Sequence, residues 1–126
     1  MVQKVSKSLH KWFLFHFIMD MVFGLPLLFF PFWTLSLFGI NIDQSFSVRL
    51  VGAALIGIGG ASFFAKEKSI EVYDILLTLK ILWSSAAIIG LLLALVFGES
   101  QILWIIVFVF VIFWFVWIYY KRKLYK

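Results

Sequence analysis

Apolar residues fall in four long runs along this chain, and short polar segments separate the runs. Several runs approach or exceed the ~18–20 residues that a helix needs to cross a hydrocarbon core of about 30 Å. The pattern predicts an all-α membrane protein in which residues 1–126 form one domain, an up-down bundle of four transmembrane helices. We expect these helices over residues of about 9–30, 46–65, 70–97 and 102–120, with an interfacial segment over 32–40.

Prolines and short polar residues mark the ends of the runs. Pro26 should kink the last turn of the first helix, and Pro31 should end it, because proline removes a backbone hydrogen bond. The segment FWTLSLFGI is too short to cross a bilayer, and Trp33 at its start is typical of a membrane surface. In the polar loop that follows, Asp43 or Ser45 is expected to cap the second helix.

Composition agrees with a bilayer environment and excludes several classes of function. The chain is 64% hydrophobic and 13% charged, about half the charged share of a soluble domain. It has no cysteine, which excludes disulfides, thiolate metal ligands and cysteine nucleophiles. The net charge of +5 comes from short basic clusters beside apolar runs. Such clusters are a topology signal and attract anionic lipid, so we expect the lipid bilayer, and not nucleic acid, as a partner.

The basic residues also predict the orientation. In a four-span arrangement, nine of them fall on one side, and Arg49 is the exception, just inside the second helix. Basic residues favour the cytoplasmic side. We therefore expect a multi-pass protein of the cell inner (cytoplasmic) membrane with both termini in the cytoplasm. The nine residues are Lys4, Lys7, Lys11, Lys66, Lys68, Lys121, Arg122, Lys123 and Lys126.

The second helix is dense in small residues, which favours close helix packing. A stripe of four lies near one face, and Gly52 and Gly59 widen it. Small residues let helix backbones approach closely in lipid, so we expect this helix at the centre of the bundle and the aromatic fourth helix at its periphery. The alternative is that the glycines line a ligand cavity or a pore. The stripe consists of Ala53, Gly57, Gly60 and Ala61.

Ionisable residues inside the first and third helices form the candidate intramembrane polar site. His16 and Asp20 stand at positions i and i+4, so they share one helix face. Asp20 lies nine residues beyond Lys11 and Lys80 nine beyond Glu71, about 13 Å along each axis at ~1.5 Å per residue. An unpaired charge at that depth costs ~2.5–3.5 kcal/mol, so we expect an Asp20–Lys80 ion pair. Two further side chains are expected near Lys80, namely Ser84 and Tyr73.

This polar site has two main interpretations. In the first, the ion pair is structural and fixes which helices pack together. In the second, Asp20 titrates in a proton- or substrate-binding site, His16 relays protons and Lys80 tunes their pKa values. His16 and Asp20 are too few for a metal site unless an oligomer completes the set. We expect no metal, no cofactor and no catalytic residue.

Arg49 is a second unusual residue, because it lies in the first turn of a helix, where the helix dipole disfavours a cation. A specific partner is therefore one interpretation, with Asp43, Glu99 or a lipid phosphate as candidates. The other interpretation is that its side chain snorkels to the outer headgroups.

The first half of the chain contains Pro31, then Phe38-Gly39, a polar loop and the pattern Arg49-x-x-Gly52-Ala53-x-x-x-Gly57-x-Gly59. This arrangement resembles the small four-helix bacterial proteins of the broad DoxX-like group. The basic, glycine-flanked start of the first span in that group is missing here. The resemblance implies a small inner-membrane protein, and no activity is carried over with it.

These features favour a non-enzymatic scaffold, or a protein that binds a partner or lipid, over a catalyst. Four short helices enclose little volume, so a homo-oligomer or a complex with another membrane protein is a candidate assembly. The alternative function is a small oligomeric proton-coupled transporter that uses Asp20, since intramembrane carboxylates commonly serve proton relays. An enzyme that acts on lipid is a third possibility and requires water to reach His16.

Overall fold

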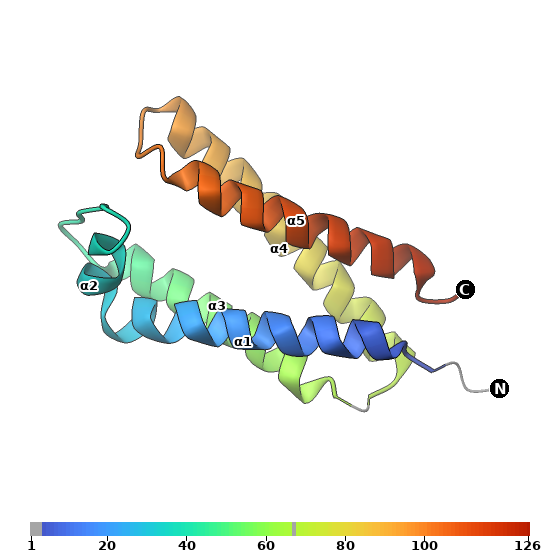
Figure 1. The fold of residues 1–126 in the computed structure, drawn as a ribbon. Coiled ribbons are helices and arrows are strands. Elements are labelled where there is room, and N and C mark those ends of the chain that lie inside the picture. Colours follow the sequence, from blue (N-terminus) through green and yellow to red (C-terminus); the bar gives the residue numbers. More distant parts are fainter. Residues whose placement is uncertain (1–3, 67) are drawn as a thin grey trace. The chain divides into compact units, whose positions relative to one another are not determined.

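The computed structural model describes residues 4–66 and 68–126, and the regular structure within them is helical, with no strand. Helix accounts for 79% of the described residues. The elements are α1 (Lys7–Phe29), α2 (Pro31–Ser36), α3 (Phe46–Phe64), α4 (Ile70–Val96) and α5 (Leu103–Lys123) (Figure 1). Of these, α1, α3, α4 and α5 are long and apolar enough to cross a membrane. The predicted all-α class with four long apolar helices is confirmed.

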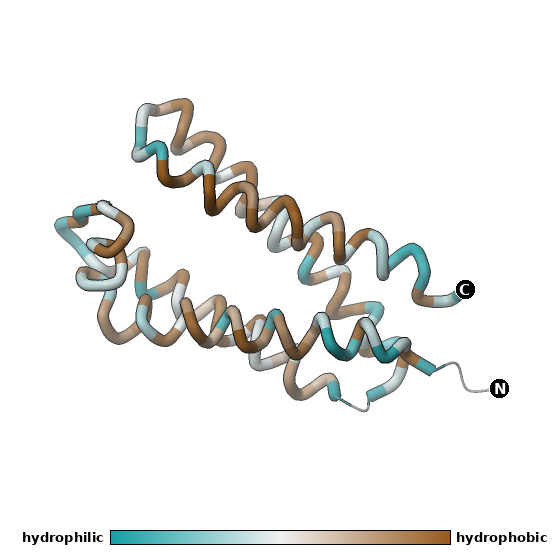
Figure 2. Tube along the Cα trace, in the orientation of Figure 1, coloured by the Kyte–Doolittle hydropathy of each residue, from teal (hydrophilic) through white to brown (hydrophobic). Residues whose placement is uncertain are grey.

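The observed helix ends lie within three residues of the predicted ones. The largest difference is at α5, which continues through Lys121, Arg122 and Lys123. Cations are favourable in the last turn of a helix, because its C-terminal end carries the negative end of the dipole. Figure 2 shows α5 as hydrophobic over most of its length and hydrophilic at this end.

The segment after α1 forms a short helix. Pro31 occupies the first turn of α2, where its missing N–H has no helical partner to lose. Ser45 stands at the N-cap of α3 but makes no side-chain capping bond. Its backbone has φ −97° and ψ −5°, whereas a capping residue is usually extended. The Ser45 hydroxyl instead accepts a hydrogen bond from Arg49 Nε at 3.0 Å.

The chain forms two compact units. We call α1, α2 and α3 the N-terminal unit, and α4 and α5 the C-terminal unit. Within the N-terminal unit, α1 and α3 lie side by side, and within the C-terminal unit α5 lies along α4 (Figure 1). The predicted four-helix bundle, with its second helix central and its fourth peripheral, stays a prediction.

Three glycines bring α1 and α3 together. A Cβ added at Gly52 would lie 2.7 Å from the Leu28 nitrogen and 2.8 Å from the Gly24 carbonyl oxygen. A Cβ added at Gly24 would meet the Gly52 carbonyl oxygen at 3.1 Å. Gly59 makes an equally close approach to α1 at Asp20. Because Gly52 and Gly59 are seven residues apart, they share one face of α3.

The predicted small-residue stripe is therefore not the face of α3 that packs on α1. Ala53 and Gly57 are exposed, and Gly60 and Ala61 are half-buried. Apart from the chain neighbours and the nearby backbone of α3 itself, no described atom lies within 4 Å of a Cβ added at Gly57 or Gly60. Small size alone did not distinguish the two faces, since glycines occur on both. Packing of another helix against this stripe stays a prediction.

The C-terminal unit is an antiparallel hairpin. Its turn contains Gly98 at φ +86°, a left-handed conformation that favours glycine. Trp114 Nε1 donates a hydrogen bond to Ser85 Oγ at 2.8 Å, and the rings of Trp83 and Phe110 make an edge contact with centroids 6.4 Å apart. These contacts join the helices near the middle of both.

Candidate intramembrane polar site

The His16–Asp20 pair lies on the buried face of α1. The Nε2 atom of His16 is 3.5 Å from Oδ1 of Asp20, so the pair forms an ion pair when the imidazole is protonated. The predicted sharing of one helix face by these two residues is thus present in the structure. The buried residues of this face, at spacings of three and four, are Leu9, Phe13, His16, Asp20 and Gly24.

The side chain of Asp20 packs directly against the backbone of α3. A Cβ added at Gly59 would lie 2.6 Å from Asp20 Cβ and 3.0 Å from its Oδ2 atom. Only a residue without a side chain fits at position 59 unless Asp20 moves. The carboxylate of Asp20 therefore fills the space that a side chain at position 59 would need. Asp20 itself is 6% exposed.

The predicted residues of α4 also share one buried face. Lys80 is 1% exposed, and Tyr73 and Ser84 are equally well covered. The face repeats every three or four residues, which is the period of one side of an α-helix. It consists of Ile70, Tyr73, Leu77, Lys80 and Ser84.

Lys80 lies over an aromatic ring of α5. Its Nζ atom is 5.0 Å from the centroid of the Trp117 ring, within the range of a cation–π interaction. Trp117 is fully buried and stacks on Phe113 with centroids 5.6 Å apart. This Lys80–Trp117 contact was not predicted from the sequence. The negative face of an aromatic ring attracts a desolvated ammonium group.

The five predicted polar residues therefore fall into two local groups. His16 and Asp20 belong to the N-terminal unit, and Lys80, Ser84 and Tyr73 belong to the C-terminal unit. The structure brings the members of each group onto one helix face. The Asp20–Lys80 ion pair stays a prediction.

Arg49 fastens the start of α3 to the end of α1. Its Nη1 atom donates a hydrogen bond to the Leu28 carbonyl oxygen at 2.6 Å, besides the bond from Nε to Ser45. Leu28 lies in the last turn of α1, where carbonyl groups lack helical partners and a cation is favourable. This contact explains a cation in the first turn of α3, and it involves the Leu28 carbonyl in place of Asp43, which lies exposed in the preceding loop.

A polar network that the sequence reasoning missed joins α4 to α5. The ammonium group of Lys121 binds Oδ1 of Asp74 and donates to Thr78 Oγ1 at 2.9 Å. Tyr125 donates its hydroxyl hydrogen to Asp74 Oδ2 at 3.1 Å. Partial desolvation and the hydrogen bond to Asp74 raise the pKa of the Tyr125 hydroxyl. The sequence does contain one indication of this network. Asp74 and Lys121 lie at the same end of two consecutive antiparallel helices, so an acid and a base are expected near each other.

A shallow open groove of about 340 Å³ lies near the start of α1, away from the buried polar face. Its lining is almost wholly apolar, with one cation, and consists of Ser8, Lys11, Trp12 and Phe15. In the part of the chain that the structure describes, no three His, Asp or Glu side chains are grouped to hold a metal ion.

Comparisons with protein-family models, curated proteins and solved structures found no match to this chain. The resemblance to the DoxX-like group rests on the residues alone and stays a prediction. The four membrane-length apolar helices are compatible with a multi-pass membrane protein.

Proposed function

We propose that this chain is a non-enzymatic scaffold of the cell inner (cytoplasmic) membrane, which binds lipid and a membrane-embedded partner. The observation that carries the proposal is the contact between Asp20 and Gly59, which lie within packing distance of each other. The carboxylate occupies the contact between two helices, where it orders their packing. A substrate at this point would have to displace α3.

The buried ionisable groups support a structural role for the polar site. His16 lies one turn from Asp20 on the same helix, and Lys80 rests on the Trp117 ring. Each charge is thus held by neighbours from its own unit. Buried charges held in this way fix the register of helices in a membrane, where apolar side chains give little specificity.

The exposed surface supports lipid as one partner. Large apolar side chains remain exposed on all four long helices, such as Val22, Leu50, Leu82 and Phe115. Side chains of this kind are suited to the hydrocarbon core. The last-turn cations of α5 and the lysines at the start of α1 support the orientation with both termini in the cytoplasm.

A second candidate function is a small oligomeric proton-coupled transporter, which the geometry of the His16–Asp20 pair favours. An imidazole and a carboxylate 3.5 Å apart can exchange a proton. In this mechanism Asp20 would bind and release the proton, and a second copy would complete the path.

Proton flux in vesicles distinguishes the two functions. The full chain and the Asp20→Asn variant are reconstituted in phosphatidylcholine vesicles that contain a pH-sensitive dye, and a potassium diffusion potential is applied. The scaffold predicts equal proton influx for both proteins and for empty vesicles. Influx above that of empty vesicles, lost in Asp20→Asn, would contradict the scaffold and support the transporter.

The partner-binding part of the proposal is tested by cross-linking, which the absence of native cysteine makes simple. Ala53→Cys places a thiol on the exposed small-residue stripe of α3, and Phe64→Cys places a control thiol on an exposed end of the same helix. A homo-oligomer through the stripe predicts disulfide-linked dimers for Ala53→Cys and few for Phe64→Cys. Equal cross-linking at both positions would indicate random collision.

A further inference from the structure

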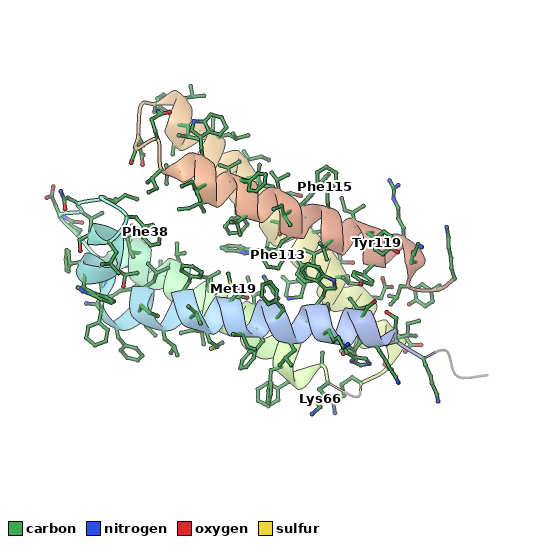
Figure 3. All side chains as sticks on the ribbon, viewed as in Figure 1. Met19, Phe38, Lys66, Phe113, Phe115 and Tyr119 are labelled. Carbon is green, nitrogen blue, oxygen red and sulfur yellow. The ribbon has the colours of Figure 1, made fainter. Side chains whose placement is uncertain are left out.

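A continuous stripe of large side chains faces outward on α5. We call it the α5 outer stripe, and each of its members is at least 43% exposed. Its positions advance by three, four, three and four residues, so they lie on one side of the helix. Figure 3 labels two of them, Phe115 and Tyr119. The stripe consists of Ile105, Phe108, Ile112, Phe115 and Tyr119.

The α5 outer stripe ends in two cations. Arg122 and Lys123 follow Tyr119 by three and four residues, so they extend the same side of the helix. The Nζ atom of Lys123 lies 4.8 Å from the centroid of the Tyr119 ring, which holds this ammonium group beside the stripe. Both cations are exposed, and both lie in the last turn of α5.

The neighbouring Lys121 binds a carboxylate of the same unit. Arg122 and Lys123 are exposed and can therefore bind an anion from outside the chain. Lys121 binds Asp74, the carboxylate of α4 at this end of the hairpin. Residues 121–126 carry four cations, against the two carboxylates Glu71 and Asp74 at the start of α4. The end of the C-terminal unit therefore has a positive excess on its exposed side.

The stripe and its cations have the dimensions of a phospholipid in one leaflet. Ile112 and Lys123 are eleven residues apart, which is about 16 Å along a helix at ~1.5 Å per residue. Half of a hydrocarbon core of about 30 Å is ~15 Å. Apolar side chains thus cover the depth of one leaflet, and an aromatic ring and then two cations follow at the headgroup level, as interfacial anchoring requires.

We propose that an anionic phospholipid binds along the α5 outer stripe, with its phosphate between Arg122 and Lys123 and an acyl chain against Phe115 and Ile112. The inference rests on the proposed membrane role and specifies which lipid the scaffold takes. The cations select an anionic headgroup over a zwitterionic one, because a choline ammonium group would be repelled by the same positive excess.

Lipid retention measured by native mass spectrometry tests this site. The full chain is reconstituted in vesicles of equal amounts of phosphatidylglycerol and phosphatidylcholine, extracted in mild detergent, and analysed for the ratio of the two lipids that remain bound. The double variant Arg122→Gln/Lys123→Gln removes the proposed site. The control Lys66→Gln/Lys68→Gln removes the same charge from two lysines whose side chains are exposed, and Figure 3 labels Lys66.

We expect the unaltered chain to be enriched in phosphatidylglycerol and the control to keep this enrichment. Arg122→Gln/Lys123→Gln should lower it on the order of ten-fold, given the attraction of each cation to an anionic surface. Retained enrichment in that variant, or equal loss in the control, would overturn the site. Displacement of the lipid by millimolar inorganic phosphate would show a free-anion site instead.

The outcomes also separate this inference from the proposed function. A chain that stays integral in phosphatidylcholine vesicles but shows no preference between the lipids contradicts only the anionic-lipid site. A chain that alkaline carbonate washes out of the vesicles contradicts the membrane role itself. Helical circular dichroism of each variant shows that the comparison is made between folded proteins.

Discussion

The Asp20 side chain and the Gly59 backbone meet at the contact between α1 and α3, so closely that a Cβ on residue 59 would lie 2.6 Å from the Cβ of Asp20. Real Cβ atoms do not approach other heavy atoms this closely. The absence of a side chain at Gly59 therefore leaves room for a carboxylate on the facing helix.

Gly59→Ala should destabilise the protein, because either Asp20 or α3 must move. Overpacking of this kind usually costs about 1–3 kcal/mol. The matched control is Gly57→Ala on the same helix, where the added methyl group meets no described atom within 4 Å. Unfolding by denaturant in mild detergent measures both. If Gly57→Ala were as destabilising as Gly59→Ala, the packing face assigned to α3 would be wrong.

Arg49→Gln should loosen the junction between α1 and α3, because the Leu28 carbonyl loses a charged donor at 2.6 Å. Arg49 is exposed, so water replaces part of the lost bond, and we expect a cost of about 1 kcal/mol. Arg49→Lys keeps the charge but not the two-pronged geometry that reaches both Leu28 and Ser45. The free energy of unfolding of Arg49→Lys should lie between those of the unaltered chain and Arg49→Gln in the same denaturant measurement. If neither change lowered this free energy, the side chain of Arg49 would only snorkel to the headgroups.

Breaking the Lys121–Asp74 contact should free the last turn of α5 without unfolding the hairpin. Both side chains are partly exposed, so the global effect should be smaller than that of Gly59→Ala. Hydrogen exchange of the backbone amides over residues 118–123 should accelerate in Lys121→Gln and in Asp74→Asn. The double variant should exchange no faster than either single one, since all three lose the same contact. Additive acceleration would mean that the two residues act separately.

The helices of this protein are predictable from sequence because the bilayer length and the proline positions constrain them. The runs that end before Pro31 and at the Gly98 turn gave helix ends close to those observed. The shared helix face of His16 and Asp20 could also be predicted from the sequence, because it depends only on helix geometry.

Contacts between helices were less predictable. The face of α3 that packs on α1 depends on the position of Asp20, and this distinguishes Gly59 from Gly57 only once the two helices are placed together. The partner of Arg49 is a main-chain carbonyl, which no side-chain pattern reveals. The Lys80–Trp117 contact likewise depends on the register of the α4–α5 hairpin, and the sequence does not give that register.

The most direct test of the proposed structural role of Asp20 and Lys80 is a double-mutant cycle on unfolding in detergent. The predicted Asp20–Lys80 ion pair implies that Asp20→Asn and Lys80→Gln each destabilise the protein and that the double variant recovers much of the loss. In that pair each single change leaves the other charge buried with only the contacts of its own unit. Tolerated single changes with no coupling would contradict the predicted ion pair. The two groups would then be assigned to a water-accessible site, and the transporter would become the leading function.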